Sequence, residues 1–480
     1  MNKRMILYIL STILLIEAAF MLLPLAVAVI YRESSGWYFL YTVAGAALTG
    51  LLLRIVSKPR FKTIYAKDGL ITVALSWIAL SLVGALPFTL SGEIPSYLDA
   101  VFETVSGFTT TGSSILTDIE ALSHCMLFWR SFSHWLGGMG VLVFMLALFS
   151  LEGGQAIHLL RAESPGPTVS KMVPRMADST KLLYGIYLAL TVLQVLFYLA
   201  GGMPLFDSLC HTFGTAGTGG FSTRAASMGA YGYYAQTVTT VFMILFGVNF
   251  SVYFFLLRRK FDLVYKNTEL RWYLIIILVA IALITINVLP LFDSFYDALH
   301  HSSFAVASII TTTGFCTADF NLWPELSRVI LVLLMMVGAC AGSTGGGLKV
   351  SRVVILVRAA QMELRRLVHP RTVKVMMIDG KPVSRDTIRA VSGYFMLYVL
   401  VMLLSVLLVS LDNFDGSTTL TAVIATFNNI GPGMSMVGPV GNFAQFSALS
   451  KLVLCLDMLF GRLELYPMLI LLLPGTWRKH

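Results

Sequence analysis

Long apolar stretches alternate with short polar connections along nearly the whole chain. Ten of them are long enough to cross a hydrocarbon core of about 30 Å as helices, and they run from Met5 to Ile30, Trp37 to Ile55, Leu70 to Pro87, Cys125 to Leu151, Leu182 to Gly201, Val238 to Leu257, Trp272 to Leu291, Val329 to Val357, Ala390 to Leu411 and Phe446 to Leu473. Four shorter stretches between them cannot span: Leu98 to Ser106, Leu205 to Phe213, Phe295 to Ile310 and Thr418 to Phe427. We predict ten spanning helices and four short re-entrant helices.

Each short stretch runs into a loop rich in threonine and glycine, or its equivalent. The four loops contain Thr109-Thr110-Thr111-Gly112, Thr218-Gly219-Gly220-Phe221, Thr312-Thr313-Gly314-Phe315 and Asn429-Ile430-Gly431-Pro432. Irregular backbone at membrane depth is tolerated only where it is buried in protein or lines water. Four such loops at matching places therefore predict one shared cavity. Glycine suits such a cavity because it adopts φ > 0 and can turn its carbonyl toward a dehydrated cation.

This repetition predicts an all-α polytopic membrane protein with one pore. Four pseudo-symmetric repeats, each made of a helix, a short pore helix, a filter loop and a second helix, would surround the pore, after two extra transmembrane helices. The predicted boundaries are 1–66 for the two N-terminal helices, 67–155, 156–262 and 263–368 for the first three repeats and 369–480 for the fourth. The C-terminal end of each pore helix would favour a cation in the cavity.

Composition supports a membrane protein and excludes other classes. The chain is 57% hydrophobic and 12% charged, with a mean hydropathy of +0.80, which is more apolar surface than a soluble protein can hide. The net charge of +9 comes from basic loops expected of a membrane protein, so we do not expect nucleic acid binding. No nucleophile lies in a pattern with a base, and the five cysteines form no C-x-x-C pair, so we expect no enzyme.

Loop charges predict the orientation. Basic residues gather on one predicted side, at Lys3 and Arg4, in the connections 54–67, 161–181, 258–266 and 352–389, and at Arg478 and Lys479. By the positive-inside rule this side, with both termini, is cytoplasmic, which points to the cytoplasmic (inner) membrane. The loops would then face outward together with twelve acids: Glu93, Asp99, Glu103, Asp118, Glu120, Asp207, Asp293, Asp297, Asp319, Glu325, Asp412 and Asp415. We predict an acidic mouth that concentrates cations.

Through these loops the chain resembles the TrkH-type potassium-uptake subunits of the Trk/Ktr/HKT superfamily, over essentially its whole length. The resemblance implies that Gly112, Gly220, Gly314 and Gly431 form a potassium filter, and Gly112 favours potassium because relatives with serine there tend to admit sodium. The implied filter residues are Thr110, Thr111, Gly112, Gly219, Gly220, Phe221, Thr312, Thr313, Gly314, Phe315, Asn429, Ile430 and Gly431. Potassium itself would lie at Thr111, Gly112, Gly219, Gly220, Thr313, Gly314, Ile430 and Gly431. The second loop departs most from the Thr-Thr-Thr pattern, which leaves the choice between Gly219 and Gly220 open.

A glycine-rich run interrupts the stretch from Val329 to Val357. Five glycines within Gly338 to Gly347 make a continuous helix unfavourable, each by up to about 1 kcal/mol relative to alanine. We predict a helix break below the filter. A phosphate-binding loop is excluded, because Leu348 separates Gly347 from Lys349. The resemblance implies an intramembrane gate here, with Gly338, Gly342, Gly345, Gly346, Gly347 and Arg462 as gating residues.

Arg462 lies in the last apolar stretch, where a buried guanidinium requires a partner or a role. Two interpretations remain open at this stage. The side chain could pair with Asp457 or Glu464, or it could project into the pore as an electrostatic barrier, which the resemblance favours. For Glu17, the Arg130 and His134 pair and Asn249, we expect satisfaction by neighbouring helices. Asp297, His300 and His301 are not expected to bind a metal.

These patterns predict potassium uptake through a selective, gated, channel-like pore driven by membrane potential. A proton- or sodium-coupled potassium symporter with the same pore is the main alternative, and a receptor or scaffold with a vestigial pore is a second. We expect potassium as the transported substrate and no tightly bound organic cofactor. The resemblance also implies a homodimer and a cytosolic nucleotide-binding TrkA-type ring, docked at 352–389 and 151–181. Any nucleotide regulation would come through that partner, since the chain has no dinucleotide fold.

Overall fold

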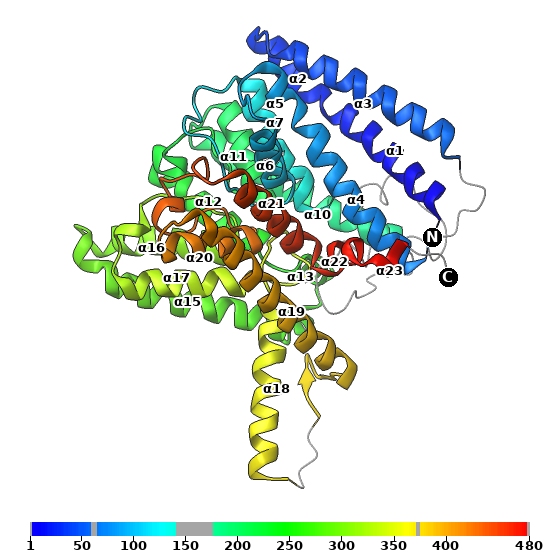
Figure 1. Cartoon of the computed structure of the whole chain (residues 1–480). Helices are drawn as coiled ribbons and strands as arrows, with labels where there is room; N and C mark the ends of the chain where they lie inside the picture. The colour runs from blue at the N-terminus through cyan, green and yellow to red at the C-terminus, as the bar shows by residue number, and fades with distance from the viewer. Residues whose placement is uncertain (1, 59–64, 141–175, 371–374, 478–480) are drawn as a thin grey trace.

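A computed structural model describes residues 2–58, 65–140, 176–370 and 375–477. Figure 1 shows a body of packed helices from which helix α18 projects. The sheet among the described residues is a two-stranded antiparallel hairpin, β1 (Met377–Ile378) with β2 (Lys381–Pro382), closed by Asp379 and Gly380, both with φ > 0. The predicted all-α class is confirmed.

The N-terminal helices lie on one side of the body. α1 (Lys3–Phe20) and α2 (Leu22–Tyr31) meet at Met21 and together give a 29-residue candidate span. The side chain of Asn2 accepts a hydrogen bond from the backbone N–H of Met5 at 3.2 Å, which satisfies one free donor at the start of the helix. α3 (Gly36–Val56) then packs against α1 (Figure 1).

The rest of the chain follows one plan four times. The first long helices are α4 (Ala66–Gly84) continued by α5 (Leu86–Ser91), α10 (Met176–Ala200), α15 (Thr268–Val288) and α19 (Arg385–Val409). The short helices are α6 (Tyr97–Phe108), α11 (Leu205–Gly217), α16 (Phe295–Ile310) and α20 (Gly416–Phe427). The second helices are α7 (His124–Gly138), α12 (Tyr233–Phe246) with α13 (Phe250–Leu257), α17 (Glu325–Val337) with α18 (Val350–Val368), and α21 (Ala448–Leu463) with α22 (Tyr466–Leu472) and α23 (Pro474–Trp477). Shorter pieces are α14 (Phe261–Tyr265), η1 (Ser227–Ala230), η2 (Leu289–Leu291), η3 (Phe320–Leu322), η4 (Ser410–Asp412) and η5 (Ser435–Val437). The four predicted short helices are confirmed.

The second helices of the last three repeats are interrupted, and two of these breaks correct the sequence prediction. The stretch from Val238 to Leu257 is not one continuous helix, because α12 and α13 meet at an angle of 89°. The stretch from Phe446 to Leu473 breaks after Leu463, where Glu464 adopts a left-handed φ of 61° and Pro467 follows, which has no N–H to continue a helix. The break predicted within Val329 to Val357 is confirmed, since α17 ends at Val337 and α18 begins at Val350.

Six helices in the described part of the chain are long and apolar enough to cross a membrane, or up to seven if the bent pair α12 and α13 counts as one span. The ten spanning helices predicted from the sequence include three that are interrupted, at 247–249, at 338–349 and after Leu463, and one that is only partly described. The second half of the predicted span from Cys125 to Leu151 lies outside the described residues, as does the predicted docking loop 151–181 up to residue 175.

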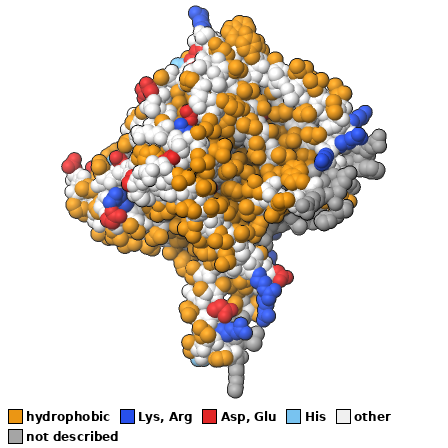
Figure 2. Space-filling view, viewed as in Figure 1, with side chains coloured by type: hydrophobic (Ala, Val, Ile, Leu, Met, Phe, Trp, Pro, Cys, Tyr) orange, Lys and Arg blue, Asp and Glu red, His pale blue; other side chains and the backbone are white. Residues whose placement is uncertain are grey.

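The outer surface of the body is apolar. Figure 2 shows hydrophobic side chains across most of the visible face, with Lys and Arg at its edge and on the projecting part. The large apolar side chains that are more than 60% exposed include Leu48, Ile55, Leu278, Ile286, Met396 and Leu407, which lie on α3, α15 and α19. Such a surface fits a lipid environment, because water-soluble proteins rarely expose continuous apolar patches of this extent.

Candidate functional site

All four glycine-containing loops begin with the same backbone turn. The residue two positions before each predicted filter glycine is left-handed, with φ from 55° to 60°, at Thr110, Thr218, Thr312 and Asn429. The residue just before each glycine donates its N–H to a carbonyl five positions earlier in the short helix: Thr111 to Ser106 at 2.9 Å, Gly219 to Gly214 at 2.8 Å, Thr313 to Ser308 at 2.8 Å and Ile430 to Ala425 at 2.9 Å. This pattern is typical of a Schellman ending, and it aligns Gly220, not Gly219, with the other three glycines.

Gly112, Gly220, Gly314 and Gly431, here called the glycine ring, contact one another in cyclic order. Their φ values lie between 79° and 100°. A Cβ atom would lie 2.0 Å from the Gly219 carbonyl oxygen if built on Gly112, 2.0 Å from that of Thr313 on Gly220, 2.0 Å from that of Ile430 on Gly314, and 2.9 Å from that of Thr111 on Gly431. Each glycine therefore faces the loop of the next repeat, and the fourth faces the first. Only glycine fits, because any side chain would collide with a carbonyl of the neighbouring loop.

The side chains that brace the loops differ from repeat to repeat. In the first loop the hydroxyls of Thr109 and Thr111 lie 2.8 Å apart, and in the third the hydroxyls of Thr311 and Thr313 do the same. In the fourth, the Asn429 side-chain amide donates to the Thr111 hydroxyl at 2.9 Å. These contacts are buried, so they stabilise the loops from within the protein interior.

The two phenylalanines predicted to be filter residues pack with their rings against buried side chains. Phe221 is 1% exposed, and its ring centroid lies 3.7 Å from the guanidinium of Arg130. Phe315 is also 1% exposed and lies near His211, with 5.7 Å between ring centroids. Both rings pack behind the loops, so any contact of these residues with a cation would come from the backbone.

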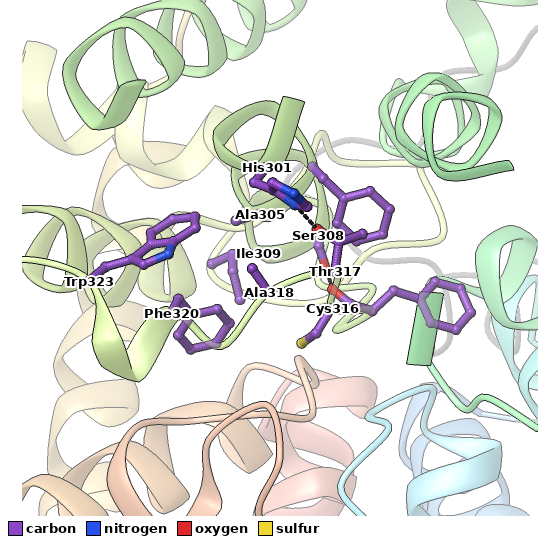
Figure 3. A pocket seen from close by; sticks show the side chains of 11 residues that line it. His301, Ala305, Ser308, Ile309, Cys316, Thr317, Ala318, Phe320 and Trp323 are labelled. Atoms are coloured by element: carbon purple, nitrogen blue, oxygen red, sulfur yellow. Dashed lines mark hydrogen bonds between the residues drawn. The ribbon is translucent and has the colours of Figure 1, made fainter. Parts of the chain in front are cut away.

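The third loop backs onto a small pocket, which Figure 3 shows from close by. The hydroxyl of Ser308 donates to the Phe315 carbonyl at 2.6 Å, and His301 Nδ1 lies 2.9 Å from the Thr317 hydroxyl (Figure 3). The neighbouring His300 instead faces Gln236 at 2.7 Å. The two histidines thus point at different partners, and the described residues contain no group of three metal-ligating side chains.

All four ring glycines line one open cavity of about 130 Å³. Its described lining residues include Arg130 and Arg224 but no carboxylate, and Glu120 lies 3.8 Å from Arg224, so the acidic mouth around the cavity stays a prediction. Several of the acids are held in contacts elsewhere. Asp99 pairs with Lys451 at 2.6 Å, and Asp207 accepts from the Thr223 hydroxyl at 2.8 Å.

Glu103 is the clearest case of an acid held in an ion pair, because it is 1% exposed and pairs with Arg130 at 2.5 Å. Its carboxylate also accepts from the Ser114 hydroxyl and the Ile115 N–H, both at 3.0 Å. Arg130 in turn donates to the Ser222 carbonyl at 3.0 Å. This buried pair links the first two loops, and the sequence analysis missed it because the two residues are 27 positions apart and on different helices.

The glycine-rich segment 338–349 lies against the filter loops of repeats 3 and 4. The N–H of Gly346 donates to the Thr312 hydroxyl at 2.6 Å. A Cβ on Gly345 would lie 2.8 Å from the Thr311 carbonyl oxygen, and one on Gly346 would lie 2.5 Å from that of Asn428. The segment is therefore in close contact with the ends of two short helices.

The break between α12 and α13 holds the same segment from the other side. Cys340 donates its N–H to the Gly247 carbonyl at 3.1 Å, and Phe250 donates to the Gly342 carbonyl at 3.0 Å. Asn249 caps α13 by accepting from the Ser251 N–H at 2.8 Å. The glycine-rich segment of repeat 3 thus interlocks with the broken helix of repeat 2.

Arg462 pairs with neither carboxylate considered from the sequence. Glu464 pairs with Arg352, and Asp457 accepts from the Ser405 hydroxyl at 2.6 Å. Among the described residues, the Arg462 guanidinium donates to the Thr110 hydroxyl (3.2 Å) and to the carbonyls of Thr344 (2.8 Å), Gly138 (2.7 Å) and Gly137. It therefore joins the first filter loop to the glycine-rich segment.

Of the remaining polar candidates, Asn249 bonds within its own helix, where it caps α13 by accepting from the Ser251 N–H. Arg130 and His134 make the expected hydrogen bonds to neighbouring segments. Glu17 does not, because it is 1% exposed and neither carboxylate oxygen has a hydrogen-bond partner among the described residues. Its surroundings include Gly84, where a Cβ would lie 3.3 Å from the Glu17 carboxylate.

Comparisons with known proteins identify relatives of the whole chain. The sequence model of the TrkH family, described as a cation transport protein, matches residues 39–475. The chain is 36% identical to the Trk system potassium uptake protein TrkH of Salmonella typhimurium and 37% identical to that of Vibrio parahaemolyticus, in each case over all of both chains. It is also similar to the crystal structure of the potassium transporter TrkH from Vibrio parahaemolyticus, with a TM-score of 0.89 and 35% identity over all of both chains.

Proposed function

This chain belongs to the TrkH family of cation transport proteins, and on that premise we propose that it takes up potassium through the glycine ring. It is a multi-pass membrane protein whose function is potassium uptake. The observation that carries the proposed site is the cyclic contact of the four glycines, each at φ > 0 and against a carbonyl oxygen of the next loop. A ring of backbone carbonyls can replace the hydration shell of a potassium ion. The proposed ion contacts are the eight backbone positions predicted from the sequence.

We propose that permeation is channel-like. A membrane potential of about 100 mV, inside negative, supplies roughly 2.3 kcal/mol per monovalent cation, enough for about fifty-fold accumulation without a coupled ion. Coupling to protons would need a titratable group in the pathway. The described residues that line the cavity contain no carboxylate, and the nearby Glu103 is engaged with Arg130.

Flux of rubidium into vesicles that contain only this protein tests the proposal. We expect the rate of rubidium uptake to follow an imposed membrane potential. We expect the reversal potential to stay unchanged when a proton or a sodium gradient is imposed. A reversal potential that shifts with the proton gradient, or potassium accumulation beyond the membrane potential driven by a sodium gradient, would establish symport, and no flux at all would indicate a receptor or scaffold.

We propose the orientation and partners that the sequence predicts. Both termini would be cytoplasmic, in the inner membrane, since Lys3 and Arg4 begin α1 and the projecting α18 carries Arg358, Arg365 and Arg366. The projecting α18 would help to dock a cytosolic TrkA-type ring, and the protein would be a homodimer. Copurification with such a ring, and its loss on removal of 358–382, tests this assignment.

We propose that the segment from Gly338 to Gly347, with Arg462, is the gate. Replacing both Gly345 and Gly346 with alanine is expected to change the open probability severalfold and to leave the potassium preference intact. The added methyl groups would collide with the Thr311 and Asn428 carbonyls. The segment should yield, because regular hydrogen bonds hold the short helices and their turns in place.

Single-channel recording of this double variant measures both quantities at once. The matched control is Gly393→Ala on α19, where a Cβ meets nothing within 4 Å. A shift in the ratio of sodium to potassium permeability, with an unchanged open probability, would contradict the assignment of the segment as a gate.

A further inference from the structure

The second filter loop lacks the side chains that brace its counterparts. In loops 1 and 3 the residue before the ring glycine is Thr111 or Thr313, and its hydroxyl contacts the threonine two positions earlier. The corresponding residues in loop 2 are Gly217 and Gly219, which have no side chain. The backbone conformation of loop 2 nevertheless matches the others, so another group must hold it.

His134 occupies the missing position. A Cβ built on Gly219 would lie 2.3 Å from both Cγ and Nδ1 of the His134 imidazole. Gly219 has no left-handed φ, so its backbone does not require glycine. Residue 219 must be glycine because the imidazole of His134 occupies the space beside it. In loops 1 and 3 the side chains of Thr111 and Thr313 occupy the equivalent space. His134 is 0% exposed and comes from α7, which belongs to repeat 1.

The imidazole is also hydrogen-bonded at both ends. Nε2 lies 3.2 Å from the backbone nitrogen of Phe221 and accepts its N–H, so Nε2 carries no proton. Nδ1 then holds the proton and donates it to the Gly107 carbonyl at 2.8 Å. A single neutral ring thus ties the last turn of α6 to the residue directly after Gly220.

Arg130, one helical turn before His134, extends the same contact surface. It donates to the carbonyl of Ser222, the next residue of loop 2, and its guanidinium lies 3.7 Å from the Phe221 ring. Its own charge is balanced by Glu103 at 2.5 Å. One face of α7 therefore contacts Phe221 and Ser222, the two residues that follow Gly220 in the chain.

We propose that His134 is a specificity-determining residue of the filter. Its imidazole, supplied by repeat 1, replaces the threonine side chain that loop 2 lacks and sets the position of the carbonyls from Gly219 to Phe221. Discrimination between potassium and sodium depends on the positions of these oxygens, so it depends on a side chain that does not contact the ion. This inference rests on the proposed filter.

The test exchanges side-chain volume between positions 134 and 219. Reversal potentials are measured under opposed potassium and sodium gradients. His134→Ala is expected to raise the ratio of sodium to potassium permeability about tenfold. Gly219→Thr alone is expected to abolish flux, because its side chain overlaps the buried ring. The double variant H134A/G219T is expected to carry flux again, with a permeability ratio closer to that of the wild type than His134→Ala shows.

Two further variants separate positioning from general stability. His134→Gln keeps one donor and one acceptor and is expected to restore the wild-type ratio at least in part. His124→Ala, on the same helix but at its exposed end, is expected to leave the ratio unchanged. Should His134→Ala not fold, His134→Leu, which keeps volume but loses both hydrogen bonds, is expected to show the same rise.

Two results would overturn the inference while leaving the proposed function in place. One is a His134→Ala or His134→Leu protein that conducts with an unchanged permeability ratio. The other is an H134A/G219T protein no more selective or active than His134→Ala. If the wild-type protein itself fails to prefer potassium, the proposed filter has failed instead, so the two failures are distinguishable.

Discussion

Replacing Gly314 with alanine is expected to reduce selective potassium uptake by about a hundredfold. The new Cβ would lie 2.0 Å from the Ile430 carbonyl oxygen and 2.9 Å from Pro432, and the φ of 82° disfavours any side chain. One of the two loops must move, which displaces carbonyls that, in the proposed filter, replace the water shell of the ion. A loss of roughly 2–3 kcal/mol of coordination energy corresponds to that factor. Rubidium uptake into vesicles measures it.

Gly416→Ala is the matched control for Gly314→Ala. Gly416 also belongs to a filter repeat, at the start of α20, but a Cβ there meets nothing within 4 Å. Its uptake should equal that of the wild type. If the folded Gly314→Ala protein kept both its rate and its preference for potassium, the glycine ring could not be the filter.

Replacing Arg462 with alanine is expected to increase potassium uptake about tenfold. The guanidinium is partly accessible, and it joins the Thr110 hydroxyl of the first filter loop to the Thr344 carbonyl of the proposed gate. Its removal unlinks these segments and, in the proposed mechanism, takes a positive charge away from the ion pathway. A unit charge within roughly 10 Å opposes a cation by about 1–2 kcal/mol at an effective dielectric constant of about 20. That energy corresponds to the expected factor.

Conductance recordings and uptake rates measure the effect of Arg462→Ala. Arg462→Lys, which keeps the charge, should remain near the wild-type rate, and Arg366→Ala removes an exposed arginine from α18 as a control. A folded Arg462→Ala protein with slower or unchanged uptake would mean that the guanidinium only braces the carbonyls of Gly137, Gly138 and Thr344.

Much of the fold is readable from local sequence. The four short helices and the break before α18 follow from length, apolar content and glycine density, which act within a few residues. The breaks at Gly247 to Asn249 and at Glu464 escaped prediction because each is shorter than the apolar stretch around it. At 247–249 the break is stabilised by hydrogen bonds to the segment 338–349, which lies about a hundred positions away in the chain.

The positions of charged groups were less predictable than the loops. A count of outward-facing acids predicts an acidic mouth, yet Glu103 and Asp99 are used in ion pairs with Arg130 and Lys451. Likewise Arg462 has two carboxylates near it in sequence and binds neither. A charged side chain in a packed interior pairs with whichever groups lie next to it in space. The separation of residues along the chain says little about which groups these are.

Local chemistry was enough to identify a membrane protein with four equivalent glycine loops, because apolar length and the conformational freedom of glycine are properties of short segments. Packing between distant segments decided the cyclic order of the glycine ring, the partners of Arg462 and the insertion of His134 behind Gly219. These features depend on contacts between segments that come together only after the four repeats have closed around one axis. No short run of neighbouring residues determines such contacts.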